Sequence, residues 1–183
     1  MLDAEFLRTA RAQFAIVGPP VTEDVILSVF PKPFPGREDL IQFYLAQNGG
    51  GRTEQSCLAF CAIREHIVPR ERVQQVRVEC FLSIFQDANE KVPPFGSILK
   101  VHATMARIYA SVPEMAAFLE SHTAVARDHS GRDLCVNTAN GSVWFLDWKE
   151  YKLGPIEIAS SFRDFVEKFW NAGPGEDFPR HDQ

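Results

Sequence analysis

The sequence predicts one domain that combines helices with an antiparallel sheet. Two stretches between residues 22 and 47 have apolar residues at helical spacing, residues 125–148 alternate like strands between tight turns, and residues 161–170 return to helical spacing. Successive strands that are joined by tight turns pair antiparallel. The 183 residues are enough for one core of ordinary size, so we expect a single domain over residues 1–173 and a flexible tail over 174–183.

Composition and charge exclude several classes of protein. Hydrophobic residues make up 45% and charged residues 23%, close to the averages for soluble globular proteins. The net charge of −5 has the wrong sign for a protein that grips phosphates over a broad surface, so we expect no nucleic-acid partner. The N-terminus lacks the pattern of a cleaved signal peptide, and no segment is long and apolar enough to span a bilayer. We therefore expect a cytoplasmic protein without a membrane partner.

Helices are expected in the N-terminal part of the chain. Residues 3–14 carry apolar side chains at helical spacing. Thr22 suits the N-cap of a second helix, which has two acids in its first turn and an apolar stripe that reaches Phe30. A third helix has its stripe over residues 40–45, and the Asn-Gly-Gly-Gly stretch at 48–51 supplies left-handed residues that end it.

The middle of the chain changes period twice. Residues 56–62 and 76–85 show the alternation of strands, and residues 97–109 return to helical spacing. Residues 111–114, Ser-Val-Pro-Glu, combine a serine N-cap, an early proline and a glutamate at the third helical position. This capping box predicts a further short helix through Leu119.

The stretch VARDHSGRDLCVNTANGSVWFLDW, residues 125–148, predicts a three-stranded meander. We expect one strand from Val125, a second over 134–138 and a third over 143–148, with a strong Asn-Gly hairpin signal at 140–141. The third strand is apolar on nearly both faces, which is typical of a central strand.

The last element is an amphipathic helix. Ser161 and Asp164 form its capping pair, and Gly173-Pro174 ends it. Its apolar positions follow at helical spacing: Phe162, Phe165, Val166, Phe169 and Trp170. Such a stripe predicts that the helix packs on the sheet and buries Phe165 and Trp170.

Acid, base and nucleophile types meet in the turn at 128–132. Asp128, His129 and Ser130 are consecutive, however, and adjacent residues of one turn cannot adopt the relay geometry of a catalytic triad. The G-x-S-x-G motif of a nucleophile elbow is absent from the sequence. Turn chemistry explains these residues, because short polar side chains bond their own backbone and Gly131 supplies a positive φ. We therefore expect no catalytic residues.

The cysteines and histidines are interpreted as structural. Four cysteines lie in apolar runs of a chain without a secretory signal, which favours free buried thiols: Cys57, Cys61, Cys80 and Cys135. Cys57 and Cys61 with His66 match a metal site only loosely, because a structural zinc site brings two tight pairs of ligands. His102 lies on the expected apolar stripe of 97–109, which favours a hydrogen-bonded core or boundary histidine. We expect neither a metal nor a cofactor.

The order of these elements resembles a known family. FPGREDLIQFYLAQNGG at 34–50 resembles the proline, amphipathic helix and Asn-Gly-Gly that mark the SUKH superfamily, named after the fungal Smi and Knr cell-wall regulators. The meander up to Trp148 is similar to the family's run of strands separated by glycine turns, and IEIASSFRDFVEKFW at 156–170 is similar to its closing helix. The resemblance spans about residues 20–170. Residues 51–75 match no part of the pattern, the helix after Ser111 looks like an insertion, and Ser160 stands where the family often has aspartate.

The resemblance implies a fold and a function. It implies a SUKH-like α+β domain with an antiparallel sheet of about four to six strands, packed by N-terminal and C-terminal helices. For bacterial members it implies a non-enzymatic immunity protein that binds and neutralises a co-encoded toxin by direct contact. The alternative, known from fungal members, is an interaction scaffold or regulatory domain without a toxin partner. A small hydrolase that uses Asp128, His129 or Asp133 is the least favoured alternative.

The partner is expected at one end of the sheet. A meander places the turn at 128–132 and the exit of the third strand at the same end, with aromatic anchors and an acidic rim that suits a basic protein surface. The residues expected to bind the partner are Asp128, His129, Arg132, Asp147, Trp148, Glu150 and Tyr151. A solvated loop end is the competing interpretation. We expect the free protein to be a monomer or a weak homodimer.

Overall fold

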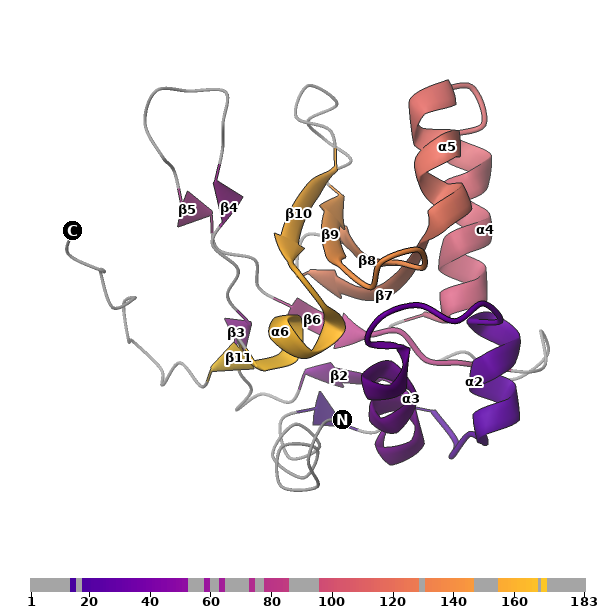
Figure 1. Ribbon diagram of the computed structural model, residues 1–183, viewed down its shortest axis with the longest axis vertical. Coiled ribbons are helices and arrows are strands. Elements are labelled where there is room, and N and C mark those ends of the chain that lie inside the picture. The colour runs from indigo at the N-terminus through magenta and orange to yellow at the C-terminus, as the bar shows by residue number, and fades with distance from the viewer. Residues whose placement is uncertain are drawn as a thin grey trace.

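An antiparallel sheet of seven strands forms the centre of the computed structural model (Figure 1). The structure describes residues 18–52, 78–85, 96–128, 131–146 and 155–167, and the backbone of five two-residue strands. The sheet order is β1-β2-β6-β7-β8-β9-β10. Its strands are β1 (Phe14–Ala15), β2 (Gly50–Arg52), β6 (Val78–Phe81), β7 (His122–Asp128), β8 (Asp133–Asn137), β9 (Val143–Leu146) and β10 (Ile156–Ala159).

Five helices surround this sheet in the described part of the chain, and two small strand pairs lie beside it. The helices are α2 (Glu23–Val29), α3 (Arg37–Ala46), α4 (Ile98–Ile108), α5 (Pro113–Ser121) and α6 (Phe162–Glu167). The pairs are β11 (Phe169–Trp170) with β3 (Leu58–Ala59), and β4 (Ile63–Arg64) with β5 (Val73–Gln74). The α+β class is confirmed. Apart from the two-residue β1, the strands of the main sheet number within the expected four to six.

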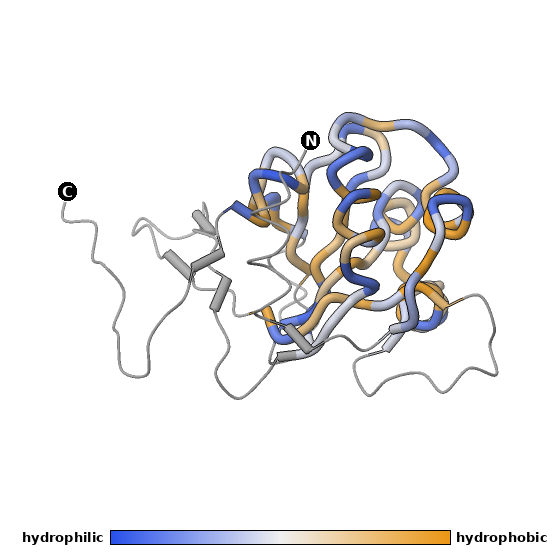
Figure 2. The backbone as a smooth tube through the Cα atoms, turned by 90° about the horizontal axis from the view of Figure 1, so that it is seen from below, coloured by the Kyte–Doolittle hydropathy of each residue, from blue (hydrophilic) through white to orange (hydrophobic). Residues whose placement is uncertain are grey.

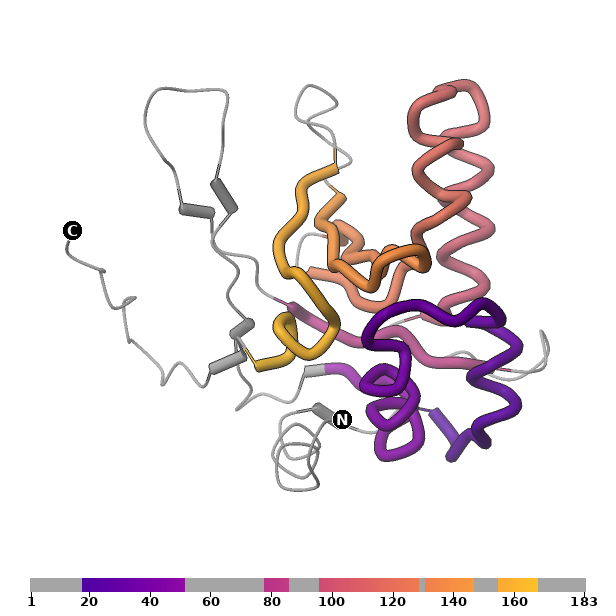
Figure 3. Tube along the Cα trace, viewed as in Figure 1, coloured from indigo at the N-terminus to yellow at the C-terminus, as the bar shows by residue number. Residues whose placement is uncertain are grey.

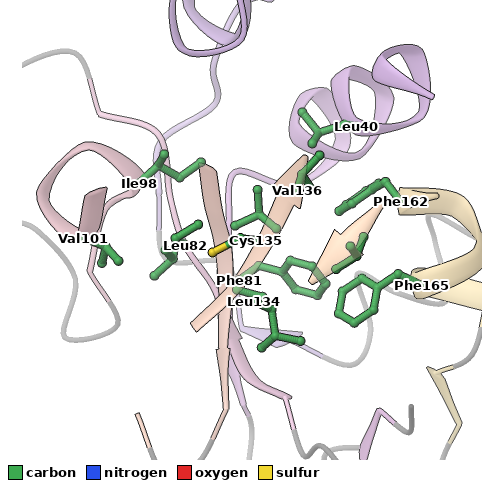
Figure 4. Packing of buried hydrophobic residues seen from close by; sticks show 14 of the residues in the cluster. Leu40, Phe81, Leu82, Ile98, Val101, Leu134, Cys135, Val136, Phe162 and Phe165 are labelled. Carbon is green, nitrogen blue, oxygen red and sulfur yellow. The ribbon is translucent and has the colours of Figure 1, made fainter. Parts of the chain in front are cut away.

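The central strands are buried on both faces (Figure 4). On one face, Leu40 of α3 and Phe162 and Phe165 of α6 pack with Phe81, Leu134 and Val136 of the sheet. On the other face, Ile98 and Val101 of α4 lie with Leu82 and Cys135. Burial from both sides explains why residues 134–136 form a continuous apolar run, and Figure 2 shows the hydrophobic residues concentrated along these inner segments.

The helices α4 and α5 form a hairpin that stands beside the sheet (Figure 3). The expected helix over 97–109 is confirmed: the Ser97 side chain caps α4 by accepting a hydrogen bond from the Lys100 N–H at 3.2 Å. In α5 the N-cap is Val112, without a side-chain bond, so the expected serine cap at Ser111 is wrong. Proline at the first helical position is enough to start this helix, because its φ is already helical.

The Asn-Gly-Gly-Gly stretch does more than end α3. The helix ends at Ala46 with an extended C-cap at Gln47, so a left-handed residue at the cap itself is wrong. The stretch does supply a left-handed residue, Gly49, just before β2 begins at Gly50. The Asn48 amide instead pairs with backbone: its Nδ2 donates to Ile84 O at 2.9 Å and to Pro19 O at 2.8 Å, and its Oδ1 accepts from Ile84 N at 2.7 Å. The Asn48 side chain therefore ties the connection between α3 and β2 to the backbone that follows β6.

Several element boundaries differ from the expectation. Strand β7 begins at His122, three positions before Val125, because α5 runs directly into it. The strand β10 was not predicted, since only its last residues are apolar and buried. The closing helix ends at Glu167 and not at Trp170, whose backbone pairs with β3 as part of β11. The capping pair is confirmed, because Ser161 Oγ accepts from Asp164 N at 3.0 Å.

Other expectations fall outside the described residues. These are the helix over 3–14 except for its last residue Phe14, which lies in strand β1, the ends of the strands at 56–62 and 143–148, the side chain of Trp170 and the tail over 174–183.

Candidate protein-binding surface

The strand register places two of the expected contact segments at one end of the sheet. Asp133 lies opposite Arg127 on β7 and opposite Leu146 on β9. The turn after Asp128 and the chain that leaves β9 after Leu146 therefore emerge on the same side, as a meander requires. Among the expected contact residues, the structure describes Asp128 and Arg132; His129, Asp147, Trp148, Glu150 and Tyr151 lie outside the described residues.

Asp128 holds the turn together from within. Its side chain is buried, its Oδ1 accepts from the Arg132 N–H at 2.8 Å, and its Oδ2 accepts from Arg132 Nε at 2.6 Å. Gly131 has a φ of +79°, which glycine adopts without strain. The expectation that Asp128 bonds its own turn is confirmed. Because this carboxylate already pairs with a guanidinium, it contributes little negative charge to a rim.

Of the two described residues in the expected contact group, Arg132 is the one that reaches the surface. Its guanidinium carbon lies 4.7 Å from the centre of the Phe145 ring, a cation–π arrangement. Its side chain keeps 18% of its surface exposed, while Phe145 beneath it is buried. The ring and Asp128 together hold the guanidinium in one position, so it can meet a partner without losing much conformational freedom.

A second arginine–aspartate pair lies beside the first. Arg127 Nε and Nη2 approach Asp133 Oδ1 at 2.9 and 2.8 Å, and the two residues are cross-strand neighbours. The Asp133 side chain is fully buried, whereas that of Arg127 is 31% exposed. In these two pairs the guanidinium groups reach solvent and the carboxylates are buried, while Glu79 on the neighbouring strand β6 is partly exposed. Beyond Glu79, an acidic rim here depends on Asp147 and Glu150, which lie outside the described residues.

An aromatic cluster lies on the α4 face, where α5 meets the sheet. The rings of Phe118 and His122 stack at 3.7 Å and 13°. Trp144 meets them edgewise, at 6.1 Å and 72° to Phe118 and at 5.5 Å and 86° to His122. Both Phe118 and Trp144 are half-buried. The expectation that the strand at 143–148 is apolar on nearly both faces did not single out Trp144, and no local signal separates it from its buried neighbours Val143 and Phe145.

Hydrogen bonds fix the histidine of this cluster in one neutral form. Its Nδ1 lies 2.8 Å from the carbonyl oxygen of Phe118, which can only accept, so Nδ1 carries the proton. Nε2 is then an unprotonated acceptor, and it is buried without a hydrogen-bond partner in the described structure. Burial lowers the pKa of His122 below its usual value, and the bond to Phe118 opposes this only in part. The imidazole ring of His122 is therefore neutral at physiological pH.

A cavity of about 180 Å³ opens between α2, the base of the α4–α5 hairpin and the sheet. Its polar lining includes Lys32, His102, Glu120, Thr123 and Thr138. His102 is half-buried, as expected of a boundary residue, but its Nδ1 is buried without a partner among the described residues. The expectation of a hydrogen-bonded histidine is therefore wrong for this atom.

The described residues contain no cluster of three or more side chains that could hold a metal ion. Cys80 and Cys135 are free and buried as expected, while Cys57 and Cys61 lie outside the described residues. Burial raises the pKa of Cys80 to about 12 and that of Cys135 well above its usual value, so neither is a thiolate nucleophile. His129 and Ser130 lie outside the described residues, and Asp128 faces Arg132.

Comparison with known proteins gives one family. The model of the SMI1 / KNR4 family (SUKH-1) matches residues 36–168, a range that begins at α3 and runs through the main sheet to the end of α6. No curated protein matches the chain significantly. In the described part of the chain, no helix has the length and apolar character that crossing a membrane requires.

Proposed function

Because the chain belongs to the SMI1 / KNR4 family (SUKH-1), which includes immunity proteins, we propose that it binds and neutralises a co-encoded bacterial toxin by direct contact. Family membership over residues 36–168 is the observation that carries this proposal. The proposed activity is binding without catalysis, in the cytoplasm, with the toxin as protein partner. The arginine–aspartate pairs support it, because they use the acidic groups of the meander to hold one turn and two neighbouring strands and not to activate a nucleophile.

The proposed contact surface is the end of the sheet at which β7 gives way to β8 and the chain leaves β9. It comprises Asp128, His129, Arg132, Asp147, Trp148, Glu150 and Tyr151. The register supports this grouping, since Asp133 pairs with Leu146. Within the group, Asp128 positions Arg132, and the other residues are proposed to meet the partner directly.

The function is tested in cells. The neighbouring gene product is expressed alone and together with this chain, and growth and co-purification are measured. Rescue of growth with a stable complex is the expected result. A neighbouring product that is toxic but is neither bound nor neutralised contradicts the proposal, and a non-toxic neighbour that still co-purifies favours the scaffold alternative.

The contact surface is tested by charge reversal in the same complex. Asp147→Lys with Glu150→Lys is expected to slow association at low salt, because rim charges act mainly on encounter rates. Asp128 is left unchanged, since reversing a buried partner of Arg132 would disturb the turn itself. The matched control is Glu23→Lys with Asp24→Lys on the exposed start of α2, which changes the net charge equally. If both pairs slow association to the same extent, the effect comes from net charge and the proposed surface is wrong.

A further inference from the structure

We propose that Trp144 and Glu157 form a subsite that takes an arginine or lysine side chain of the protein partner. The subsite lies on the α4 face of the sheet, on β9 and β10. The chain that leaves β9 leads to the contact surface proposed above. It rests on the proposed function in that its occupant belongs to the bound protein.

The strand register brings the two side chains together. Trp144 on β9 and Glu157 on β10 are direct antiparallel partners, so they project from the same face of the sheet. Directly opposed residues of this kind have Cβ atoms about 4.5–5.5 Å apart. On the other side of Trp144 the cross-strand partner is Cys135, a buried thiol. The indole thus lies between the apolar core and an exposed carboxylate.

The indole is held in place before any partner arrives. Its Nε1 donates to Ser142 Oγ at 2.8 Å, and Ser142 Oγ donates to Asn140 Oδ1 at 2.7 Å. The edgewise contacts with Phe118 and His122 support the ring from within the protein. Because His122 is neutral, this support adds no positive charge that would repel a cation. A rigid, half-buried tryptophan is the kind of residue that dominates protein interfaces.

Glu157 supplies the charge that selects the occupant. It is exposed, and it has no ion-pair or hydrogen-bond partner within the described ranges. In this it differs from Asp39, Asp128 and Asp133, each of which pairs with an arginine. An unpaired carboxylate beside an indole favours a cation, because the ring attracts it through its π face while the carboxylate accepts its N–H groups. A guanidinium meets both at once, since it stacks through its plane and donates along its edge.

The chemistry is tested without the natural partner. The protein, labelled with ¹⁵N, is titrated with blocked Gly-Arg-Gly and Gly-Lys-Gly peptides, and the Trp144 indole N–H signal is followed by NMR. Blocked Gly-citrulline-Gly is the neutral isostere of the arginine peptide. The cationic peptides are expected to shift this signal, with an affinity that falls about two- to five-fold in Trp144→Leu and in Glu157→Gln. Glu23→Gln, which makes the same charge change on α2, is expected to have no effect.

Each outcome decides the matter. Two results together support the subsite. The citrulline peptide causes no shift, and the affinity for the cationic peptides falls in Glu157→Gln but not in Glu23→Gln. An equal shift with citrulline, no shift with any peptide, or equal weakening in Glu23→Gln and Glu157→Gln overturns it. Glu157→Gln keeps the test valid if Trp144→Leu fails to fold, because Glu157 is exposed. A failure of toxin neutralisation with a positive titration would reject the proposed function alone.

Discussion

The carboxylate of Asp39 accepts two hydrogen bonds from the guanidinium of Arg163, at 2.6 Å from Nη2 to Oδ1 and 3.2 Å from Nε to Oδ2. The pair joins the first turn of α3 to α6 across 124 positions of sequence. The Asp39 side chain is 10% exposed and that of Arg163 is 36% exposed. Paired geometry of this kind is directional, so it sets how the two helices lie on the same face of the sheet.

Replacing Arg163 with glutamine is expected to lower the free energy of unfolding by about 1–2 kcal/mol, because it leaves a mostly buried carboxylate without its cation. Urea denaturation measures the change. Arg107→Gln on the exposed side of α4 is the control, and it is expected to change stability by less than about 0.5 kcal/mol. Equal stabilities of the two variants would show that the pair contributes nothing.

Gly49 and Gly131 provide a matched test of close packing at the Asn-Gly-Gly stretch. Both have a positive φ, 72° and 79°, so alanine pays a similar backbone penalty of about 1 kcal/mol at either position. A Cβ on Gly49 would lie 2.3 Å from Ser83 Oγ and 2.9 Å from Phe81 O, whereas a Cβ on Gly131 meets nothing within 4 Å. Gly49→Ala is expected to lose at least about 2 kcal/mol more than Gly131→Ala, because overpacking moves backbone. Similar midpoints of thermal unfolding in the two variants would contradict this steric account.

Phe165 tests whether α6 is docked. The residue is buried and its ring contacts Phe81 and Phe162 at centroid distances of 6.3 and 6.4 Å. Phe165→Ala is expected to cost about 3–5 kcal/mol, the range for truncating a buried aromatic side chain. Leu99→Ala, at a side chain that is 53% exposed, serves as the control. A loss below about 1 kcal/mol for Phe165→Ala would mean that the helix does not depend on this contact.

His122 predicts a loss of stability in mild acid. Its pKa in the folded protein is lowered by burial, so below the unfolded value of about 6.5 the unfolded chain binds a proton that the folded protein does not. The free energy of unfolding therefore falls as the pH drops from about 7.5 to about 5.5, by at most about 1.4 kcal/mol per pH unit for this group. His122→Phe is expected to reduce this slope, and His102→Phe is the comparison. An unchanged slope in His122→Phe would show that another group causes the pH dependence.

Local patterns were enough for much of the fold. The helices α3 and α4, the meander of β7, β8 and β9, and the burial of the apolar stripe of α6 follow from periodicity, capping and turn residues close together in sequence. The Asn-Gly signal at 140–141 is confirmed by the turn between β8 and β9. The motifs at 34–50 and 156–170 also sufficed to indicate the family, because their order along the chain survives where single positions vary.

The candidate surfaces depended on contacts that no local pattern contains. Asp128 looks like an exposed turn residue in the sequence, yet the fold buries it against Arg132 and leaves the guanidinium as the exposed group. The neighbours Trp144 and Glu157 are 13 positions apart in the sequence numbering, and only the pairing of β9 with β10 makes them adjacent. An alternating pattern of four residues is too short to predict a strand, which is why β10 and the position of Glu157 were not predicted.

The sequence by itself determined the helices α3 and α4 and the meander of β7, β8 and β9, because those elements depend on side chains within a few residues of one another. It also determined the excess of acidic over basic residues and the family. Only the tertiary structure decided which charges are paired and which are left for a partner. Asp39 pairs with Arg163 because of the placement of the helices on the sheet, and Asp133 pairs with Arg127 because of the strand register. Burial and pairing are properties of positions in space, so one carboxylate is a buried structural anchor at Asp133 and another is exposed at Glu157, according to where the fold places them.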